Sequence, residues 1–254
     1  MFFSDHRIDA VSNLGAFLRS VASGAPAPEG LEDLAEALRA AATKSLRHNG
    51  WFTEANVYHA LASWGEALTK KNLLAWRDRE GGTREVNRHR VGIVMAGNIP
   101  LVGLHDFLSI FLSGHFAVVK MSSDDEALMP VLATVLLRQD PLFEGDWVFV
   151  DQLNDMGAVI ATGSDNTARY FEYYFGKYPN IIRKNRTSLA LLDGSESDEE
   201  LVALGSDIFQ YFGLGCRNVG HLLAPADFDI QRVFANIVDW SDVVGRRVSR
   251  ATVA

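Results

Sequence analysis

The chain has 254 residues, of which 48% are hydrophobic and 22% charged, and its formal net charge is -8. This length accommodates one large domain or two ordinary ones, and the acidic balance argues against nucleic acid as a partner because phosphate binding needs a basic surface. A single cysteine excludes an intrachain disulfide and a multi-cysteine zinc site, so no metal site is expected, and a reducing, cytoplasmic setting fits best.

Residues 1–90 are expected to form a helical region. Apolar residues recur at helical spacing between residues 8 and 48, with a linker-like break at 23–28 that is rich in small residues and proline. A further helix is expected over residues 53–74. The polar segment 78–90 predicts a loop or a short edge strand before the core begins.

From residue 91 the pattern changes, because short β-rich apolar runs alternate with helical patterns. Strands are expected over 91–96, 116–120, 147–150, 159–161, 188–192 and 221–224, and helices over 101–112, 125–138, 165–175, 198–212 and 227–238. This alternation predicts an α/β protein with a mostly parallel sheet, helices on both faces and ligands at the carboxyl ends of the strands. The basic, aperiodic residues 245–254 are expected to be a frayed end.

Neither a signal peptide nor a membrane span is expected. The N-terminus lacks a basic region followed by an apolar core. The most apolar stretch, residues 91–114, contains Asn98, Pro100, His105 and Asp106, each costly or disruptive in the centre of a bilayer. His105 and Asp106 fall within an expected helix with no second ligand cluster, so a packing or hydrogen-bonding role is expected for both.

Polar residues end three of the expected strands. Asn98, fixed by the following Pro100, can aim an amide N–H at a ligand, although asparagine is also an ordinary turn residue. Lys120 ends a buried strand. Its ammonium group either binds a ligand or reaches solvent at the edge of the sheet while its methylene chain stays against apolar residues. Ser164 precedes a helix whose backbone N–H groups suit a phosphate, although an ordinary N-cap is the simpler interpretation of this serine alone.

The only cysteine, Cys216, follows the bend Gly213-Leu214-Gly215 and precedes Arg217. The glycines let the backbone turn and let a ligand approach closely. The neighbouring cation favours the nucleophilic thiolate. A small buried side chain is the alternative, because free cysteines are among the most buried residues.

In chain order these motifs resemble those of the aldehyde dehydrogenase superfamily, most closely its LuxC-type acyl-CoA reductase branch. The matching segments are Asn98-Ile99-Pro100, Lys120, Thr162-Gly163-Ser164 and Gly213-Leu214-Gly215-Cys216. The strings at 95–103 and 192–197 are especially similar to the LuxC branch. No single motif is decisive, but four in the right order over residues 91–242 are fairly specific.

The resemblance implies an aldehyde-dehydrogenase-like fold with N-terminal helices over residues 1–90. A Rossmann-type, nucleotide-binding parallel sheet domain is expected over 91–184. An α/β catalytic domain is expected over 185–254, and it is expected to be incomplete because proteins of this family continue well beyond residue 242.

The resemblance also implies roles for individual residues. Cys216 attacks a thioester carbonyl and holds the acyl group, while the Asn98 amide and the Cys216 backbone N–H form an oxyanion hole. Lys120 meets the adenosine ribose of a nicotinamide cofactor. The expected cofactor-binding residues are Lys120, Ser122, Ser123, Gly163 and Ser164.

Two departures from the family pattern refine the expected reaction. Ala190 occupies the position of the general-base glutamate of ordinary aldehyde dehydrogenases, which favours reduction of a thioester over oxidation of an aldehyde. Ser123 replaces an acidic residue that would hold a ribose 2′-hydroxyl, which favours NADPH without excluding NADH.

The expected function is therefore NADPH-dependent reduction of a fatty acyl-CoA, or of an acyl-carrier thioester, to an aldehyde. The alternatives are a CoA-acylating aldehyde dehydrogenase that acts on short aldehydes and an inactive nucleotide-binding protein. The candidate protein partners are a further copy of the chain, forming a homo-oligomer, and an acyl-transferring protein.

Overall fold

The computed structural model describes residues 2–243, and the chain divides into two compact units, Met1–Lys184 and Asn185–Ala254. Residues 245–254, the expected frayed end, lie outside the described residues. Within residues 2–243 no helix is both long enough and apolar enough to cross a bilayer.

Four helices begin the first unit: α1 (Asp5–Ser23), α2 (Glu32–His48), α3 (Glu54–Ala67) and α4 (Lys70–Arg79). The Ser4 hydroxyl caps α1, and Gly24 ends it in a left-handed conformation. The single helix expected over 53–74 is wrong, because the Thr69 side chain accepts a hydrogen bond from the Asn72 N–H and starts α4 as a new helix. Helices α1 and α3 pack closely, since a Cβ added to Gly15 would lie 2.7 Å from the Leu68 carbonyl oxygen.

The rest of the first unit alternates strands and helices. These are β1 (Arg90–Val94), α5 (Leu104–Leu112), β2 (Phe116–Lys120), α6 (Leu128–Gln139), the 3-10 turn η1 (Pro141–Phe143), β3 (Trp147–Phe149), β4 (Ala158–Thr162), α7 (Asp165–Phe175) and β5 (Asn180–Arg183). The five strands form one parallel sheet in the order β3-β2-β1-β4-β5. The sequence did not predict β5, which pairs only with β4.

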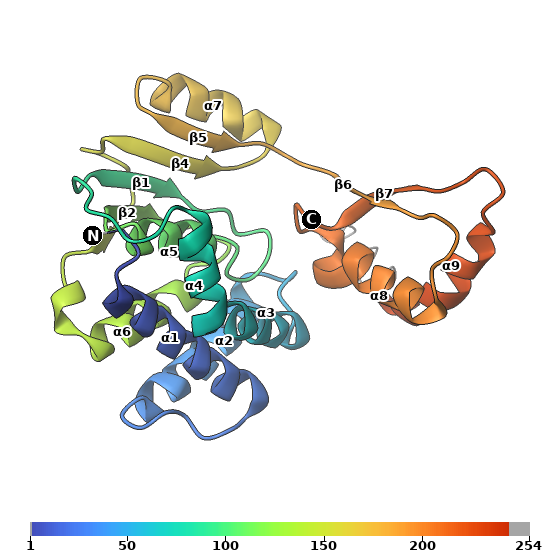
Figure 1. Ribbon diagram of the computed structural model, residues 1–254, viewed down its shortest axis with the longest axis horizontal. Coiled ribbons are helices and arrows are strands. Elements are labelled where there is room, and N and C mark those ends of the chain that lie inside the picture. The colour runs from blue at the N-terminus through green and yellow to red at the C-terminus, as the bar shows by residue number, and fades with distance from the viewer. Residues whose placement is uncertain (1, 244–254) are drawn as a thin grey trace. The chain divides into compact units, whose positions relative to one another are not determined.

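Helices cover both faces of this sheet (Figure 1). Ile93 and Ile160 face the larger core, which also contains apolar residues of α1, α5 and α6. Val159 and Ala161 face the other way and pack beneath Phe171 of α7. The alternation of side chains along each strand therefore produces two cores, one on each face of the sheet.

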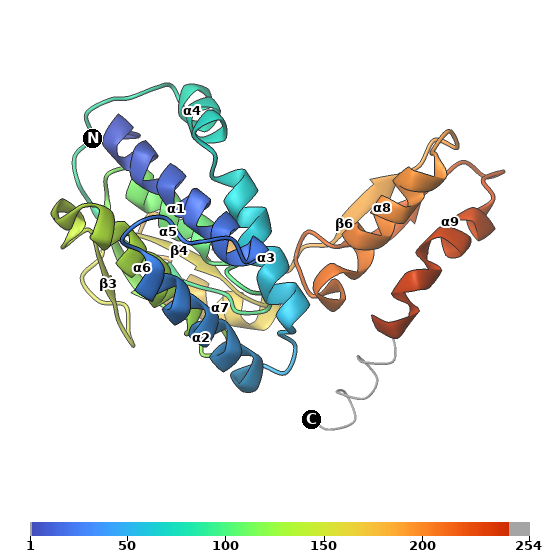
Figure 2. The ribbon, with the colours of Figure 1, turned by 90° about the horizontal axis from the view of Figure 1, so that it is seen from below.

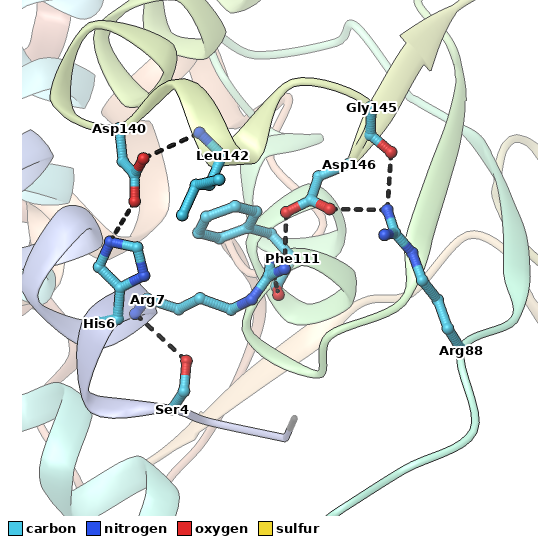
Figure 3. A network of polar contacts seen from close by, with 9 residues as sticks. All are labelled: Ser4, His6, Arg7, Arg88, Phe111, Asp140, Leu142, Gly145 and Asp146. Carbon is cyan, nitrogen blue, oxygen red and sulfur yellow. Dashed lines mark hydrogen bonds and ion pairs between the residues drawn. The ribbon is translucent and has the colours of Figure 1, made fainter.

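Helix α1 is fastened to the sheet by a buried carboxylate, Asp146, which is 3% exposed. Its two oxygens lie 2.6 Å from nitrogen atoms of Arg7 and Arg88, and Arg7 also donates to the Phe111 carbonyl at 2.9 Å (Figure 3). Two cations compensate the burial of this charge, and one of them comes from α1. The N-terminal helices and the sheet thus share one unit.

The second unit consists of β6 (Ser188–Leu191), α8 (Asp198–Phe209), the 3-10 turn η2 (Gln210–Gly213), β7 (Val219–Leu223), α9 (Ile230–Ile237) and the 3-10 turn η3 (Val238–Trp240). The two strands are parallel, and α8 and α9 lie beside each other (Figure 2). Leu192, Leu201, Leu204 and Val233 form its core. Ser197 and Glu200 make a capping box that starts α8.

Several helices are shorter than expected, and for α8 and α9 the structure shows the cause. Helix α8 ends at Phe209 rather than at residue 212, because Tyr211 and Phe212 adopt left-handed backbone conformations. Helices α5, α6 and α9 begin at Leu104, Leu128 and Ile230 rather than at residues 101, 125 and 227. For α9 the cause is Asp229, whose side chain accepts from the Gln231 N–H and caps the helix.

Candidate active site

The three turns that carry Asn98, Lys120 and Ser164 lie at the carboxyl edge of the five-stranded sheet. Strand β1 lies between β2 and β4, with Val94 paired to Lys120 on one side and to Ala161 on the other. The chain leaves β1 toward β2 and β3 and later returns to β4 on the opposite side, so this is the point where the strand order reverses. Open α/β sheets bind ligands at such a point.

The turn that carries Asn98 lies directly against the loop that follows β2. A Cβ added to Gly97 would come within 2.8 Å of the Ser122 Cβ and 3.0 Å of the Asp124 Cβ, so only glycine permits this approach. The Met95 N–H also donates to the Lys120 carbonyl at 3.0 Å. Asn98, Lys120 and Ser123 are exposed, and Ser122 is half-buried.

The turn after β4 begins α7. The Ser164 hydroxyl accepts from the Thr167 N–H at 3.3 Å and lies 2.9 Å from the Thr167 hydroxyl, so Ser164 is the N-cap of this helix. The Gly163 N–H donates to the Arg183 carbonyl at 3.1 Å. A helix N-terminus attracts anions, and contact of Gly163 and Ser164 with a pyrophosphate stays a prediction.

Two buried carboxylates support these turns. Asp125 is 5% exposed, and its Oδ2 accepts from the Leu101 N–H at 2.7 Å; burial raises the pKa of this carboxyl to about 7, although the Leu101 bond opposes the rise. Asp106 is also 5% exposed and accepts from the Arg183 guanidinium at 2.6 and 2.7 Å. Burial raises the pKa of Asp106, but hydrogen bonds from His105 and Arg183 outweigh it and hold this pKa below its usual 3.8.

His105 and Asp106 have the packing and hydrogen-bonding roles expected from the sequence. The His105 ring stacks on Trp76 of α4 with ring centroids 5.6 Å apart, and its Nδ1 lies 3.5 Å from an Asp106 oxygen. Within residues 2–243 no three His, Cys, Asp or Glu side chains gather in a way that would hold a metal ion.

Cys216 is exposed in a turn between η2 and β7 of the second unit. Asn218 closes this turn twice, since its N–H donates to the Gly215 carbonyl at 3.0 Å and its Oδ1 accepts from the Gly215 N–H at 2.8 Å. The Asn218 amide also donates to the carbonyls of Asp207 and Gln210, each at 3.0 Å. The thiol is thus presented by a braced turn and is not the small buried side chain considered as an alternative.

The structure therefore places the candidate residues in two groups. The first unit brings together Asn98, Lys120, Ser122, Ser123, Gly163 and Ser164 at one sheet edge. Cys216 belongs to the second unit, and its approach to Asn98 stays a prediction. Ala190, which the sequence resemblance predicts to occupy the general-base position, packs against the apolar core of the second unit.

Sequence reasoning missed three residues that support this site: Asp125, Arg183 and Asn218. Only Asn218 could have been found from the local sequence. It follows a glycine-rich bend, and asparagine side chains commonly form hydrogen bonds with nearby backbone groups. The partners of Asp125 and Arg183 lie far away along the chain.

No protein-family model and no curated protein matches the sequence of this chain. Solved structures match its fold. A NAD-dependent benzaldehyde dehydrogenase from Corynebacterium glutamicum superposes with a TM-score of 0.62 at 12% identity, over 92% of this chain and 54% of that one.

Two further matches belong to the same group of enzymes. The glyceraldehyde-3-phosphate dehydrogenase GapN from Methanocaldococcus jannaschii, solved with NADP, gives a TM-score of 0.60 at 15% identity, over 93% of this chain and 58% of that one. A Mycobacterium tuberculosis aldehyde dehydrogenase, solved with NAD+, gives a TM-score of 0.55 at 18% identity, over 94% of this chain and 52% of that one.

These matches define an α/β protein built on a five-stranded parallel sheet flanked by helices. More particularly, the chain has the aldehyde dehydrogenase fold, as the sequence predicted, and it spans about half the length of the solved structures it matches. At these identities the likeness concerns the fold alone.

Proposed function

We propose that this chain carries the acyl-thioester reductase chemistry of its fold, converting a fatty acyl-CoA or an acyl-carrier thioester to an aldehyde with NADPH. The observation that carries the proposal is the convergence of the Asn98, Lys120 and Gly163 turns at the point where the strand order reverses. The exposed Cys216 supplies the nucleophile.

The donor set at the sheet edge fits a dinucleotide. Lys120 offers a cation, Ser122 and Ser123 offer hydroxyls, and the start of α7 at Ser164 offers backbone N–H groups for a pyrophosphate. When bound, the nicotinamide cofactor supplies the hydride that reduces the acyl carbonyl. The absence of an acidic residue at Ser123 supports NADPH, because a carboxylate there would repel a 2′-phosphate.

The chain's own residues perform the covalent part of the reaction. The Cys216 thiolate attacks the thioester carbonyl, a carbon–sulfur bond to Cys216 forms, and the bond to CoA breaks with CoA leaving as the thiol after protonation. The Asn98 amide and the Cys216 N–H donate hydrogen bonds to the carbonyl oxygen as it gains charge. One such donor typically lowers the barrier by about 3 kcal/mol.

Ala190 supports reduction over hydrolysis of the acyl-enzyme. Its methyl group packs with the core beneath β6 and β7, so this position offers no carboxylate to activate water. An acyl group on Cys216 would therefore persist until a hydride reaches it and the aldehyde leaves with regeneration of the thiolate.

The proposal is tested by mass spectrometry of the 254-residue chain after incubation with isotopically labelled acyl-CoA. We expect one acyl group on Cys216 in the natural protein and none in Cys216→Ser, together with NADPH-dependent release of aldehyde by the natural protein only. An unlabelled Cys216 combined with retained NADPH binding would favour the inactive nucleotide-binding protein instead. Faster turnover of short aldehydes in the presence of CoA would favour the CoA-acylating dehydrogenase.

The role of Asn98 has a matched control near the same strand. Asn98 and Asn87 are both exposed, but Asn87 precedes β1 and Asn98 follows it, so they flank opposite ends of this strand. We expect Asn98→Ala to slow acylation of Cys216 by a factor of about 100, which corresponds to one lost oxyanion donor. Asn87→Ala should acylate at the natural rate, and equal rates in the two variants would exclude Asn98 from the oxyanion hole.

A further inference from the structure

Asp125 joins two loops of the candidate site that lie far apart in the sequence. Its backbone N–H donates to the Ser122 carbonyl at 3.2 Å, which closes the loop after β2 into a turn. Its side-chain Oδ2 accepts from the Leu101 N–H at 2.7 Å, across 24 positions of the chain. The carboxyl therefore fastens the segment that follows Asn98 to the loop after β2.

Leu101, which donates this hydrogen bond, has a backbone conformation that requires stabilisation by its surroundings. Leu101 has a φ of 58°, in the left-handed region that branched side chains rarely adopt, and its side chain is fully buried. The Leu104 N–H donates to the Leu101 carbonyl at 3.1 Å, so Leu101 also closes the turn that leads into α5. A left-handed conformation of this kind persists only when its surroundings stabilise it. The hydrogen bond from the Leu101 N–H to Asp125 stabilises it at the peptide group that leads back to Asn98.

The contact that the Asp125 carboxyl makes with Leu101 is that of a hydrogen-bond acceptor. Among the described residues its Oδ1 is buried and has no hydrogen-bond partner. In the part of the chain that the structure describes, no cation contributes to the pKa of Asp125, which burial raises to about 7. An asparagine carbonyl can therefore replace the acceptor, whereas an alanine cannot.

We propose that Asp125 is a positioning residue that sets the Asn98 amide for the acyl carbonyl by holding Leu101 in its left-handed conformation. This inference rests on the proposed function, because Asn98 has an oxyanion to meet only if Cys216 is acylated. Asp125 itself touches neither substrate nor cofactor. Its effect reaches the reaction through the backbone of residues 98–101.

The test compares Asp125→Ala, Asp125→Asn and the control Asp124→Ala, which changes an exposed carboxylate of the same loop. We expect Asp125→Ala to slow Cys216 acylation by acyl-CoA at least tenfold while the Kd for NADPH changes less than twofold. Asp125→Asn should restore the rate to within threefold of the natural protein, and Asp124→Ala should match it. An unchanged rate in Asp125→Ala, or an equal loss in Asp125→Asn, would overturn the proposal.

Amide hydrogen exchange provides a readout that does not depend on activity. The Leu101 amide should exchange at least tenfold faster in Asp125→Ala than in Asp125→Asn or Asp124→Ala, with the amides of β1 and β2 unchanged. If Asp125→Ala does not fold, Asp125→Val removes the acceptor while filling a similar volume and takes its place in both assays. Absence of acylation in the natural protein would refute the proposed function, whereas unchanged Leu101 exchange would refute the role of Asp125.

Discussion

Replacing Arg183 by alanine should destabilise the first unit, because it leaves the buried carboxylate of Asp106 without its guanidinium partner. The Arg183 guanidinium contacts both carboxylate oxygens of Asp106, a residue that is 5% exposed. The Arg183 carbonyl also accepts a hydrogen bond from the Gly163 N–H. Removing one partner of a buried pair typically costs about 3–5 kcal/mol. The Arg183 side chain is itself 30% exposed and His105 also contacts Asp106, so we expect a loss of about 2–3 kcal/mol.

Urea denaturation followed by tryptophan fluorescence measures this loss, because every tryptophan except Trp240 lies in the first unit. Arg169→Ala, an exposed arginine on α7, is the control and should lose less than 0.5 kcal/mol, roughly the range of surface changes. The double variant Asp106→Asn/Arg183→Ala should lose less than the sum of the single changes. A loss below about 1 kcal/mol in Arg183→Ala, or additive effects, would refute the reasoning.

The same pair has a defined dependence on pH. Because the pKa of Asp106 is held below 3.8 in the folded protein, ionisation of this group stabilises the fold at pH values above its ordinary pKa. That stabilisation is lost as the pH falls through the lowered pKa. The difference in unfolding free energy between the natural protein and Asp106→Asn should therefore vanish in acid.

Three further outcomes are expected. Asp125 has a folded pKa raised to about 7, so the natural protein should lose up to about 4 kcal/mol relative to Asp125→Asn as the pH rises from 4 to above 7, measured by urea denaturation at each pH. Ser123→Glu should raise the KM for NADPH about tenfold and leave the KM for NADH nearly unchanged, because repulsion between the new carboxylate and the 2′-phosphate costs roughly 1.4 kcal/mol. Equal changes in the two KM values would show that Ser123 does not belong to the cofactor site. Asn218→Ala should increase amide exchange over residues 211–218 severalfold, and unchanged exchange would show that the Cys216 turn holds without this side chain.

Elements with complete local signals were predicted most accurately. Strand β2 and helix α7 have the bounds expected from the sequence, 116–120 and 165–175. An apolar run identifies the first, and the Ser164 cap with Gly176 at the other end identifies the second. Strand β5 was missed because a four-residue edge strand becomes a strand only through its pairing with β4, which lies elsewhere in the chain.

The same distinction applies to the candidate site. Asn98, Lys120 and Ser164 stand at strand ends that a local pattern marks, and parallel pairing then brings those ends together. The supporting contacts depend on tertiary packing: Asp125 reaches Leu101 across 24 positions, and Arg183 reaches Asp106 across 77. The sequence therefore indicates which residues gather at the strand ends of the candidate site but not which residues hold them in place.

The supporting contacts imply that cofactor binding and acylation are separable in this chain. The Asn98 turn is fastened through Asp125 and the Gly163 turn through Arg183, both within the first unit, whereas Asn218 braces the Cys216 turn from within the second. Groups held in this way are preorganised before a ligand arrives. All candidate cofactor residues belong to the first unit, so changes in the second unit should leave NADPH affinity intact. The proposed acylation would draw on Asn98 of the first unit and Cys216 of the second, so its rate should fall when either turn is loosened.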